Sequence, residues 1–582
     1  MGPLPDPAHD FPSRRTEDVM TAVLAKLVRV RAALRAPGAP FETFDTPDGP
    51  RYRQGPHTLR ELLDATLAHG DRPFLIAGSD RLTFAEHHAA AAALAHHYRE
   101  RYRLRPGDRV VIAMRNLPEW QTAFWAAQLA GLVAVPLNAW WEAAELAYAL
   151  DDCSPGLIVA DRERTERTAS WAAAHGVPLL TVRTPGPAHD RLEELPLDGL
   201  AAPGVSPSPE DQATLLYTSG TTGHPKGVAA THRAWCAAAL NPRFFALGSM
   251  ICSNLDPARA PVHTALMTYP FFHVAAFTAL FPLMASGGAV VLMHRWDPAE
   301  ALRLIAEHRV TAYYGVPATT LGLLDAADAA GAPLDSLRAI STGGAAAPPE
   351  LARRIARRFD GRVEARNGYG LTETCGGVIA NLGARYLEQP DSIGHPAPAV
   401  EVRIAGPTGT ALPDGEIGEL WLRGQPIFSG YRNNPEATAA AFTDGWFRTG
   451  DLARLRDGEV YIVDRLKDMV IRGGENVYCV EVEGVLFDHP EVADAAVIGV
   501  PHPVLGEEVA AVVVLRPGSS VDADGLRDHV AARLAAFKVP AHVFLRSTDL
   551  PRNPTGKIVK RALRSEVTTG PPPGPTPDRP AP

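Results

Sequence analysis

The sequence predicts an α/β protein: a large N-terminal domain of two doubly wound α/β subdomains plus a β subdomain, then a small α+β C-terminal domain. From Leu59 onward, helical and strand patterns alternate in the βαβ rhythm of mostly parallel sheets. After about residue 398, short strands with turn signals replace that rhythm, and after Asp464 a smaller unit begins. We therefore expect four segments: an N-terminal extension (1–55), a core (56–464), a C-terminal domain (465–563) and a disordered tail (564–582).

The N-terminal extension contains one predicted helix. Residues 1–15 are rich in proline and polar residues, and we expect them to be disordered. In residues 16–35, apolar residues recur at helical spacing, with lysine and arginine between them. A basic amphipathic helix can lie on a membrane surface. Packing of this helix against the protein's own body is the favoured interpretation, and peripheral membrane contact stays open.

The two α/β subdomains lie on either side of a glycine-rich stretch near residue 220. Thr83-Phe-Ala-Glu86 has the pattern of a capping box that opens a long alanine-rich helix. Residues 119–130 form the next expected helix. The expected strands are 74–77, 108–114, 133–137, 156–160, 290–293, 312–315 and 339–343.

The last third of the chain should hold short strands and one further helix. Strands are expected at 400–404, 418–422 and 461–463 in the β subdomain, and at 495–498 and 508–515 in the C-terminal domain. A helix is expected over about 523–536. A Pro/Gly tail follows from about Gly570.

Composition narrows the function classes. Of 582 residues, 46% are hydrophobic and 21% charged, which is ordinary for a globular protein. The net charge of −9 argues against a nucleic-acid partner, which usually meets a basic face. Five scattered cysteines form no C-x-x-C pair, so we expect reduced thiols and a cytoplasmic location. No apolar run is long enough for a transmembrane segment, and the first residues do not form a signal peptide.

The glycine-rich stretch Tyr217-Thr-Ser-Gly-Thr-Thr-Gly-His-Pro-Lys-Gly-Val228 follows an apolar strand. Its glycines let the backbone approach a ligand closely. Its hydroxyls, backbone N–H groups and Lys226 suit an oligophosphate. It is not the common nucleotide loop, because no hydroxyl follows the lysine. The alternative interpretation is a surface turn rich in glycine and threonine.

Four further stretches concentrate polar groups. In Asn367-Gly-Tyr-Gly-Leu-Thr-Glu-Thr374, an aromatic ring can stack on a base, and the glutamate is a hard oxygen ligand that suits Mg²⁺. In Gly445–Leu452, the carboxylate of Asp451 can hold a ribose diol. Asp464–Val477 contains Arg465, the pair Gly473-Gly474 and charges suited to a hinge. Pro551–Lys557 presents Lys557 as a mobile point charge.

The chemistry is narrowed by the motifs that the sequence does not contain. We find no H-E-x-x-H, no G-x-S-x-G and no Walker loop. A phosphate site that lacks a protein nucleophile suits a substrate that itself provides the nucleophile. A carboxylate does so, since it is ionised at neutral pH. Catalysis then consists of positioning and of charge stabilisation at phosphorus.

These stretches, in this order and spacing over residues 56–563, resemble the adenylate-forming superfamily of acyl-CoA synthetases, peptide-synthetase adenylation domains and luciferases. Gly473-Gly-Glu-Asn-Val-Tyr478 and Val500-Pro-His-Pro503 look most like bacterial fatty-acyl and medium-chain acyl-CoA ligases. The resemblance implies that a carboxylate attacks the α-phosphorus of Mg·ATP to give acyl-AMP and pyrophosphate. The C-terminal domain, implied to be mobile, then rotates, and the thiol of coenzyme A attacks the acyl-AMP.

The resemblance also implies roles for single residues. The loop over the β- and γ-phosphates comprises Thr218, Ser219, Gly220, Thr221, Thr222, Gly223 and Lys226. Adenine would lie among Gly344, Ala345, Ala346, Asn367, Gly368, Tyr369 and Gly370. Thr372 would meet the α-phosphate, Glu373 with Thr218 would bind Mg²⁺, and Asp451 with Arg465 would hold the ribose. Lys467 would be the hinge, Lys557 the catalytic lysine, and Gly473 and Gly474 would line the path of CoA.

The motifs say less about which carboxylic acid is the substrate. In Pro270-Phe-Phe-His-Val274, Phe272 and His273 match an aromatic/histidine gate. His273 joins Lys557, Thr218 and Glu373 as the expected catalytic residues. α-Amino-acid activators carry an aspartate at the His273 position, so an amino-acid substrate is disfavoured. The alternative for His273 is a satisfied core histidine. Gly315 and Gly343 would leave room for an alkyl chain, and an aryl acid could use the same space.

The resemblance therefore implies an ATP-dependent carboxylic-acid–CoA ligase for a fatty or other aliphatic acid, with ATP, Mg²⁺ and coenzyme A. The alternatives are an aryl-acid CoA ligase and a stand-alone adenylating enzyme that loads an acyl carrier protein. Fatty-acid versions of the latter usually carry an inserted segment. The absence of an obvious insertion between Pro398 and Lys467 favours CoA as the acceptor.

Overall fold

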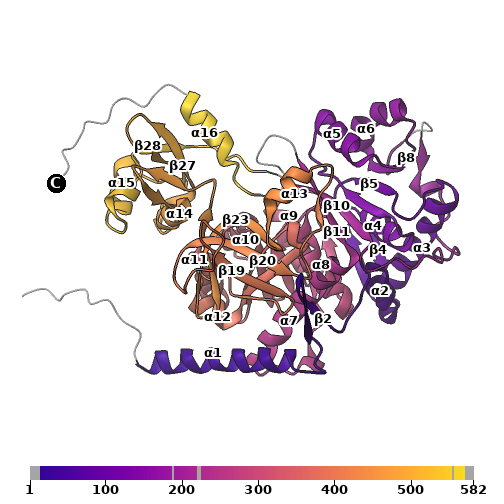
Figure 1. Cartoon of the computed structure of the whole chain (residues 1–582), viewed down its shortest axis with the longest axis horizontal. Coiled ribbons are helices and arrows are strands. Elements are labelled where there is room, and N and C mark those ends of the chain that lie inside the picture. Colours follow the sequence, from indigo (N-terminus) through magenta and orange to yellow (C-terminus); the bar gives the residue numbers. More distant parts are fainter. Residues whose placement is uncertain (1–13, 186–188, 219–224, 554–555, 570–582) are drawn as a thin grey trace, which may run out of the picture.

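The computed structural model describes residues 14–185, 189–218, 225–553 and 556–569 (Figure 1). Two large sheets and a smaller β sheet make up the main body. The C-terminal strands and helices form a separate unit beside it, seen at the upper left of Figure 1. The expected order of two α/β subdomains, a β subdomain and an α+β unit is confirmed.

The first sheet has eight strands in the order β21-β11-β10-β6-β5-β7-β8-β9. Its middle strands pair in parallel, and β11 and β21 close one edge in antiparallel. Its strands are β5 (Arg109–Ala113), β6 (Val133–Pro136), β7 (Leu157–Asp161), β8 (Leu179–Val182), β9 (Asp190–Arg191), β10 (Gln212–Thr218), β11 (Lys226–Thr231) and β21 (Gly430–Tyr431). The helices within this stretch are α3 (Phe84–Glu100), α4 (Pro118–Leu129), α5 (Ala143–Cys153) and α6 (Arg162–His175).

The second sheet has nine strands in the order β18-β17-β16-β15-β14-β12-β13-β3-β4. Its strands are β3 (Pro73–Ala77), β4 (Asp80–Thr83), β12 (Thr264–Met267), β13 (Ala289–Leu292), β14 (Ala312–Gly315), β15 (Ala339–Gly343), β16 (Glu364–Leu371), β17 (Gly376–Leu382) and β18 (His395–Pro396). Its helices are α7 (His232–Cys252), α8 (Val274–Ser286), α9 (Pro298–Glu307), α10 (Pro317–Ala329), α11 (Pro349–Phe359) and α12 (Gly383–Glu388). The β3–β4 hairpin precedes the first sheet in sequence, yet it pairs here.

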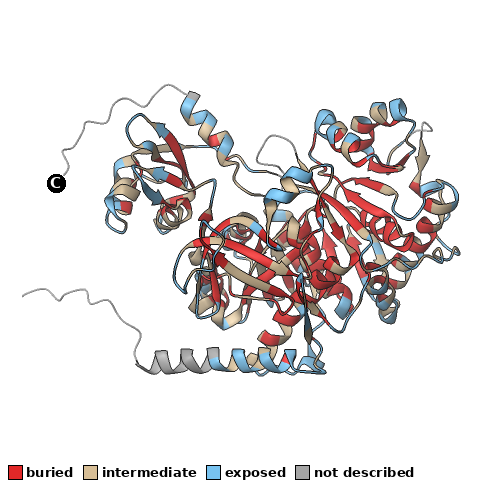
Figure 2. Ribbon diagram, viewed as in Figure 1, coloured by how far each residue is buried: buried red, intermediate tan, exposed pale blue. Residues whose placement is uncertain are grey.

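An aromatic core joins the two sheets. Helix α4 is buried along its whole length and contacts β5 and β6 of the first sheet as well as β3 of the second. Its Phe124 ring lies 4.9 Å from that of Phe277 on α8, which in turn lies 4.7 Å from the ring of Trp235 on α7. Figure 2 shows this interior as continuous buried ribbon. Because the two sheets share one core, the ends of their strands keep fixed positions around a common site.

The β subdomain is a five-stranded antiparallel sheet made of β19 (Val400–Ala405), β20 (Gly418–Gly424), β22 (Phe442–Thr443), β23 (Trp446–Arg456) and β24 (Glu459–Arg465), with α13 (Pro435–Ala441) beside it. The N-terminal hairpin β1 (Thr43–Thr46) and β2 (Gly49–Tyr52) packs against it. Phe41 and Tyr52 lie in its hydrophobic core, so the end of the N-terminal extension is built into the large domain.

Helix α1 (Arg14–Arg35) covers the predicted helix and packs against α7. Leu27 and Leu34 are buried, and the Lys26 ammonium donates to the carbonyl of Cys252 at 2.7 Å. These contacts agree with the favoured interpretation that the helix packs on the protein's own body. Among the described helices, none is both long and apolar enough to cross a bilayer.

The C-terminal unit contains β25 (Val470–Arg472), β26 (Glu475–Val477), β27 (Val492–His502), β28 (Gly506–Leu515), β29 (His542–Arg546), α14 (Cys479–Phe487), α15 (Ala523–Ala531) and α16 (Lys560–Thr569). Two expectations are wrong here. The helix expected over 523–536 ends at Ala531. The tail was expected to begin at residue 564, but α16 continues to Thr569 because Leu563 packs in the core under β27 and β28. Residues 570–582 lie outside the described part.

Candidate active site

One cluster joins the β subdomain to the second sheet. Asp451 on β23 pairs in register with Arg465 at the end of β24, and the Arg465 Nε lies 3.1 Å from the Asp451 Oδ1. The hydroxyl of Tyr369, on β16, donates to the Asp451 Oδ2 at 2.6 Å. Asp451 is only 3% exposed. The structure thus brings together the residues expected around adenine and ribose, and an ionised carboxylate has further lone pairs for a diol.

A second cluster surrounds Glu373, which lies in the short helix η4 (Thr372–Thr374) directly after β16. Its Oε1 accepts a hydrogen bond from the hydroxyl of Tyr431 at 2.8 Å. The Lys226 ammonium lies 4.9 Å from the centre of the Tyr431 ring. Burial raises the pKa of the Glu373 carboxyl. A divalent cation here would restore the ionised form, so the residue fits a magnesium ligand.

Magnesium usually keeps several waters and bridges one or two carboxylates to phosphates. Within the described residues, no three histidine, cysteine or acidic side chains gather in a set that could hold a metal on their own. The donor set around Glu373 therefore fits a cation carried in with a phosphate substrate. It does not fit a stand-alone metal site.

The glycine-rich stretch is described only at its base. Thr218 ends β10 and pairs with Lys226, the first residue of β11. The expected loop residues Ser219, Gly220, Thr221, Thr222 and Gly223 lie outside the described part of the chain. The described base lies near Glu373, because Tyr431, whose hydroxyl donates to Glu373, pairs on β21 with Val228 of β11.

Lys557 reaches this site from the C-terminal unit. Its backbone N–H donates to the Asn553 Oδ1 at 2.9 Å, and Arg552 holds the same turn by donating to the Gly556 carbonyl and to Asp494 at 2.6 Å. A Cβ added to Gly556 would lie 2.7 Å from the Val316 side chain, so the turn presses on the start of α10.

The ammonium of Lys557 interacts electrostatically with residues of the first cluster. Burial, with Arg465 next, lowers its pKa to about 7, while Asp451 opposes the shift. Burial and then Lys557 lower the pKa of His273 to about 4, so His273 is neutral near pH 7. His273 also caps α8, since its Nδ1 accepts from the Ala275 N–H. Two of the four expected catalytic residues, Lys557 and His273, therefore interact electrostatically.

The shifted lysine leads to a pH prediction. The free enzyme should lose the positive charge of Lys557 as the pH rises above about 7. Because kcat/KM reports ionisations of the free enzyme, kcat/KM for ATP should fall above that pH. Lys557→Arg keeps its charge, so its profile, scaled to its own maximum, should lack this decline. The measurement is pyrophosphate release from roughly pH 6 to 9; an unchanged decline in the arginine variant would assign it to another group.

The expected hinge lies where the chain leaves the main body. Lys467 is exposed in the turn between β24 and β25, which is closed by the Asp468 N–H donating to the Arg465 carbonyl at 2.9 Å. Beyond it, Gly473 and Gly474 form the two-residue turn of the β25–β26 hairpin with φ of +59° and +91°. Such hairpin turns favour positive φ. Both glycines are exposed, and a Cβ on Gly474 would meet no atom within 4 Å.

A cavity of about 140 Å³ lies between the second sheet and helices α7 and α8. His273 and Gly343 line it, together with Gly344, Asn367, Gly368, Tyr369 and Gly370. A Cβ at Gly370 would lie 1.9 Å from the Gly376 carbonyl oxygen, so β16 and β17 can approach only with glycine there. Thr372 lies half-buried just beyond the strand, and Ala345 and Ala346 do not line the cavity.

Two expected acyl-pocket residues lie elsewhere. Gly315 does not line the cavity, because the hydroxyls of Thr319, Thr268 and Tyr313 fill the space where its Cβ would be, at 2.5 to 2.7 Å. Phe272 lines a neighbouring cavity instead. Side-chain hydroxyls from neighbouring elements thus fill the room expected at Gly315, and Phe272 lines a different cavity from His273 and Gly343. The assignment of these residues to an acyl pocket stays a prediction.

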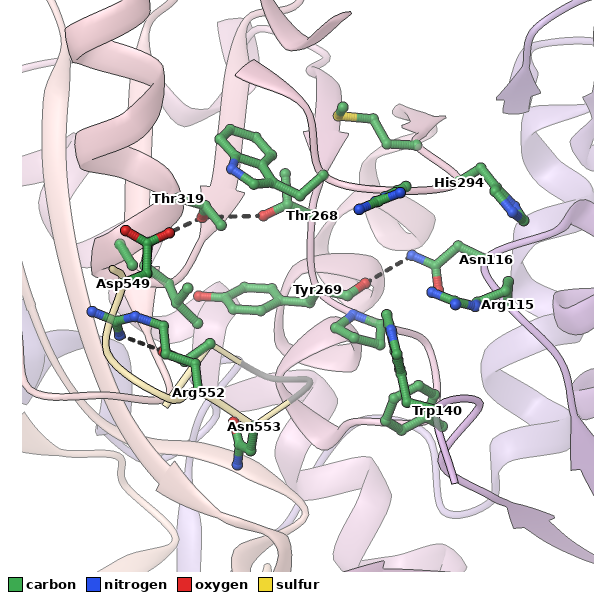
Figure 3. Close-up of a pocket in the computed structure, with 18 residues that line it drawn as sticks. Arg115, Asn116, Trp140, Thr268, Tyr269, His294, Thr319, Asp549, Arg552 and Asn553 are labelled. Carbon is green, nitrogen blue, oxygen red and sulfur yellow. Dashed lines mark hydrogen bonds between the residues drawn. The ribbon is translucent and has the colours of Figure 1, made fainter. Parts of the chain in front are cut away.

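The neighbouring cavity has a volume of about 350 Å³ (Figure 3). Figure 3 shows Arg115, Asn116 and Trp140 on one side, and Asp549 and Arg552 of the C-terminal unit on the other. The Arg115 guanidinium lies 4.1 Å from the Trp140 ring centre. The sequence reasoning missed these residues and Tyr431. Arg115 and Asn116 follow a buried strand, and polar residues at that position are a usable signal.

Comparisons with known proteins agree with the geometry. The sequence profile of the AMP-binding enzyme matches residues 63–432, and that of the AMP-binding enzyme C-terminal domain matches residues 481–557. A feruloyl-CoA synthase of Amycolatopsis sp. is 38% identical over 490 residues, covering 84% of this chain and 94% of the relative. Long-chain-fatty-acid–CoA ligase FadD13 of Mycobacterium tuberculosis is 35% identical, covering 79% and 88%.

Among solved structures, the o-succinylbenzoate CoA synthetase MenE of Bacillus subtilis, in complex with its acyl-adenylate intermediate, superimposes with a TM-score of 0.72 at 29% identity. The match covers 88% of this chain and 98% of that one. With the clusters around Asp451, Glu373 and Lys557 assembled on such a frame, the chain belongs to the AMP-binding enzyme family, within the adenylate-forming superfamily that its motifs resemble.

Proposed function

We propose that this enzyme is an ATP-dependent carboxylic-acid–CoA ligase that forms an acyl-AMP intermediate and releases pyrophosphate and AMP. Its substrates and cofactors are ATP, Mg²⁺, coenzyme A and a small carboxylic acid. Support comes from the family and from relatives named as CoA ligases that align over most of their length. The acid proposed from the sequence is fatty or otherwise aliphatic.

The observation that carries the proposal is the position of Lys557. A lysine from the C-terminal unit, on a turn seated against α10, shares the electrostatic environment of Asp451, Arg465 and His273 from the main body. A cation placed there can stabilise the negative charge that develops as a carboxylate approaches phosphorus. No general base is needed, because the attacking carboxylate is already ionised.

The remaining residues position the nucleotide. Tyr369 provides a ring face for a base, and Asp451, held by two donors, can accept from ribose hydroxyls. Magnesium bound at Glu373 would neutralise phosphate charge when present. Thr218 and Lys226, which pair at the base of the glycine-rich stretch, would bind the leaving pyrophosphate. The roles of all these residues are part of the proposal.

The second half-reaction requires a rearrangement. The Lys557 turn forms part of the wall of the larger cavity through Arg552, Asn553 and Gly556, whereas the exposed Gly473 and Gly474 do not line that cavity. We propose that rotation about Lys467 withdraws the turn after acyl-AMP forms. The glycine hairpin then takes its place beside the arm of CoA, which needs close backbone approach.

The test is an acid-dependent ATP–pyrophosphate exchange assay over a panel of aliphatic and aryl acids, followed by detection of the thioester with CoA. The proposal expects exchange with at least one acid and a CoA thioester from the same acid. Exchange without any thioester would remove CoA as the acceptor and favour the carrier-protein alternative. No exchange with any acid would contradict the adenylation half.

The aryl-acid alternative has specific support. The void beside His273 is about 140 Å³ and is shared with the residues expected around adenine, which leaves little room for a long alkyl chain. A relative named feruloyl-CoA synthase is 38% identical. We therefore keep short and medium aliphatic acids and aryl acids as the two acid classes for the panel.

A further inference from the structure

One row of side chains closes one end of the smaller cavity. Tyr314, Ser341, Arg366 and Leu382 are register partners on the four adjacent strands β14, β15, β16 and β17. Register partners point to the same face of a sheet. All four line the cavity. Two residues nearer the nucleotide, the corresponding row contains Gly343, Gly368 and Ala380, which leave the space open.

The opposite wall of the cavity is mostly apolar. It consists of Pro242, Phe245 and Ala246 from α7 and Val274, Ala275, Thr278, Ala279 and Pro282 from α8. A guanidinium at the end of such a pocket is unusual, because a buried charge needs specific partners. A pocket meant only for an alkyl chain would be expected to end in apolar side chains.

The side chain of Arg366 is held in place by Glu364 and Tyr314. Its Nε and Nη2 lie 2.6 Å and 2.5 Å from the Glu364 Oε2, and it also interacts with the hydroxyl of Tyr314. Glu364 accepts a further hydrogen bond from Ser249 on α7. A guanidinium has five N–H donors. Two of them point to Glu364 and the guanidinium also interacts with Tyr314, so donors remain for an oxygen atom in the cavity.

The charge of this cluster is already balanced. Glu364 compensates Arg366, and although burial alone acts the other way, Arg366 and Ser249 lower the pKa of Glu364, so the pair is ionised. His263 lies near both, and burial lowers its pKa to about 4, which keeps it neutral. A second carboxylate would leave one uncompensated negative charge in a buried site. A neutral oxygen would not.

We propose that Arg366 is a specificity-determining residue that donates a hydrogen bond to a neutral oxygen at the end of the acid remote from its carboxylate. This inference rests on the proposed acid–CoA ligase activity and names its substrate class: aliphatic or aryl acids with a distal hydroxyl, ether or keto oxygen. With a strand rise of about 3.3 Å per residue, Arg366 lies roughly 10 Å along β16 from Tyr369. The oxygen that Arg366 would bond therefore belongs to the part of the acid remote from the base that Tyr369 would face.

The test compares matched acids that differ only in the distal oxygen: octanoate with 8-hydroxyoctanoate, and cinnamate with 4-hydroxycinnamate. In the wild type, kcat/KM for pyrophosphate release should favour the oxygenated member of at least one pair by about tenfold to a hundredfold, as for a site built to bond a hydroxyl. The pair that shows the preference distinguishes an aliphatic from an aryl scaffold. No preference in either pair would overturn the inference.

Variants then assign the preference to the cluster. In Arg366→Met the ratio within the preferred pair should fall to near one, and a ratio within each variant is independent of the fraction of active enzyme. Arg366→Met combined with Glu364→Gln avoids an unpaired buried carboxylate and should give the same ratio. The matched control is Arg362→Met, an exposed arginine outside the cavity, which should keep the wild-type ratio. A wild-type ratio in both Arg366 variants would overturn the inference.

A charge test gives an independent check. Glu364→Gln leaves Arg366 without its counter-charge, so the α,ω-dicarboxylate octanedioate should gain about tenfold relative to 8-hydroxyoctanoate. No gain would contradict the charge-balance argument. If no acid is activated by the wild type, the proposed function itself fails. If acids are activated without distal-oxygen preference, only this inference fails.

Discussion

Replacing Lys557 with alanine is expected to lower the rate of acyl-AMP formation by about a hundredfold or more, the cost of losing a preorganised electrostatic group. The side chain is a cation brought to Asp451, Arg465 and His273 by the turn that Arg552 and Asn553 hold. Thioester formation from supplied acyl-AMP and CoA should be spared, because in our account the turn has withdrawn before that step.

The two half-reactions can be measured separately, as single-turnover acyl-AMP formation and as CoA consumption with synthetic acyl-AMP. Lys538→Ala is the matched control, since Lys538 lies in the same unit but pairs with Glu481 at 2.7 Å. This control should change neither rate. Equal loss of both half-reactions in Lys557→Ala would contradict the proposed alternation of the C-terminal unit.

Glu373→Gln is expected to lower adenylation by about a hundredfold and to raise the Mg²⁺ concentration needed for half-maximal rate. The amide keeps the size and the contact with Tyr431 but removes the charge that attracts the cation. The measurement is the adenylation rate as a function of Mg²⁺ concentration at fixed ATP. An unchanged Mg²⁺ dependence would mean that another group holds the metal.

Tyr431→Phe is the matched second variant. It removes the hydroxyl that donates to Glu373 at 2.8 Å but leaves the ring beside Lys226. Loss of a residue that orients a metal ligand typically costs about tenfold to a hundredfold. We expect the lower end, with the Mg²⁺ requirement shifted in the same direction as in Glu373→Gln.

The sequence correctly predicts the elements whose stabilising contacts lie within a few residues of one another. The capping box at Thr83 and Glu86 forms as predicted, because both of its hydrogen bonds lie within four residues. The buried strands β5, β6 and β7 also lie where continuous apolar runs placed them. The glycine-rich stretch and Glu373 come directly after the strands β10 and β16, at the kind of position where open α/β sheets bind ligands.

Long-range pairing was beyond the sequence reasoning. The β3–β4 hairpin joins the second sheet, and Tyr431 joins the first, through pairings that span more than two hundred residues in each case. No local periodicity encodes such partners. For this reason the sequence did not predict Tyr431 as a neighbour of Glu373. It also did not predict that hydroxyls of Thr268, Tyr313 and Thr319 fill the space beside Gly315.

The proposed role of Arg366 could not be predicted from the sequence for the same reason. Arg366 directly precedes the Asn367–Thr374 stretch. Its role depends on its neighbours Glu364, Tyr314 and Ser249, which the sheet register and α7 bring together. A charged residue in a strand reads from sequence as solvent-facing. Its place at the end of a cavity follows from the folded structure alone.

The most direct test of the central claim is the product balance of one reaction with ATP, Mg²⁺, CoA and an accepted acid. The account predicts AMP, pyrophosphate and acyl-CoA in equal amounts, with pyrophosphate appearing before thioester when CoA is withheld and then added. Formation of ADP and phosphate, or thioester without AMP, would contradict an adenylate-forming mechanism.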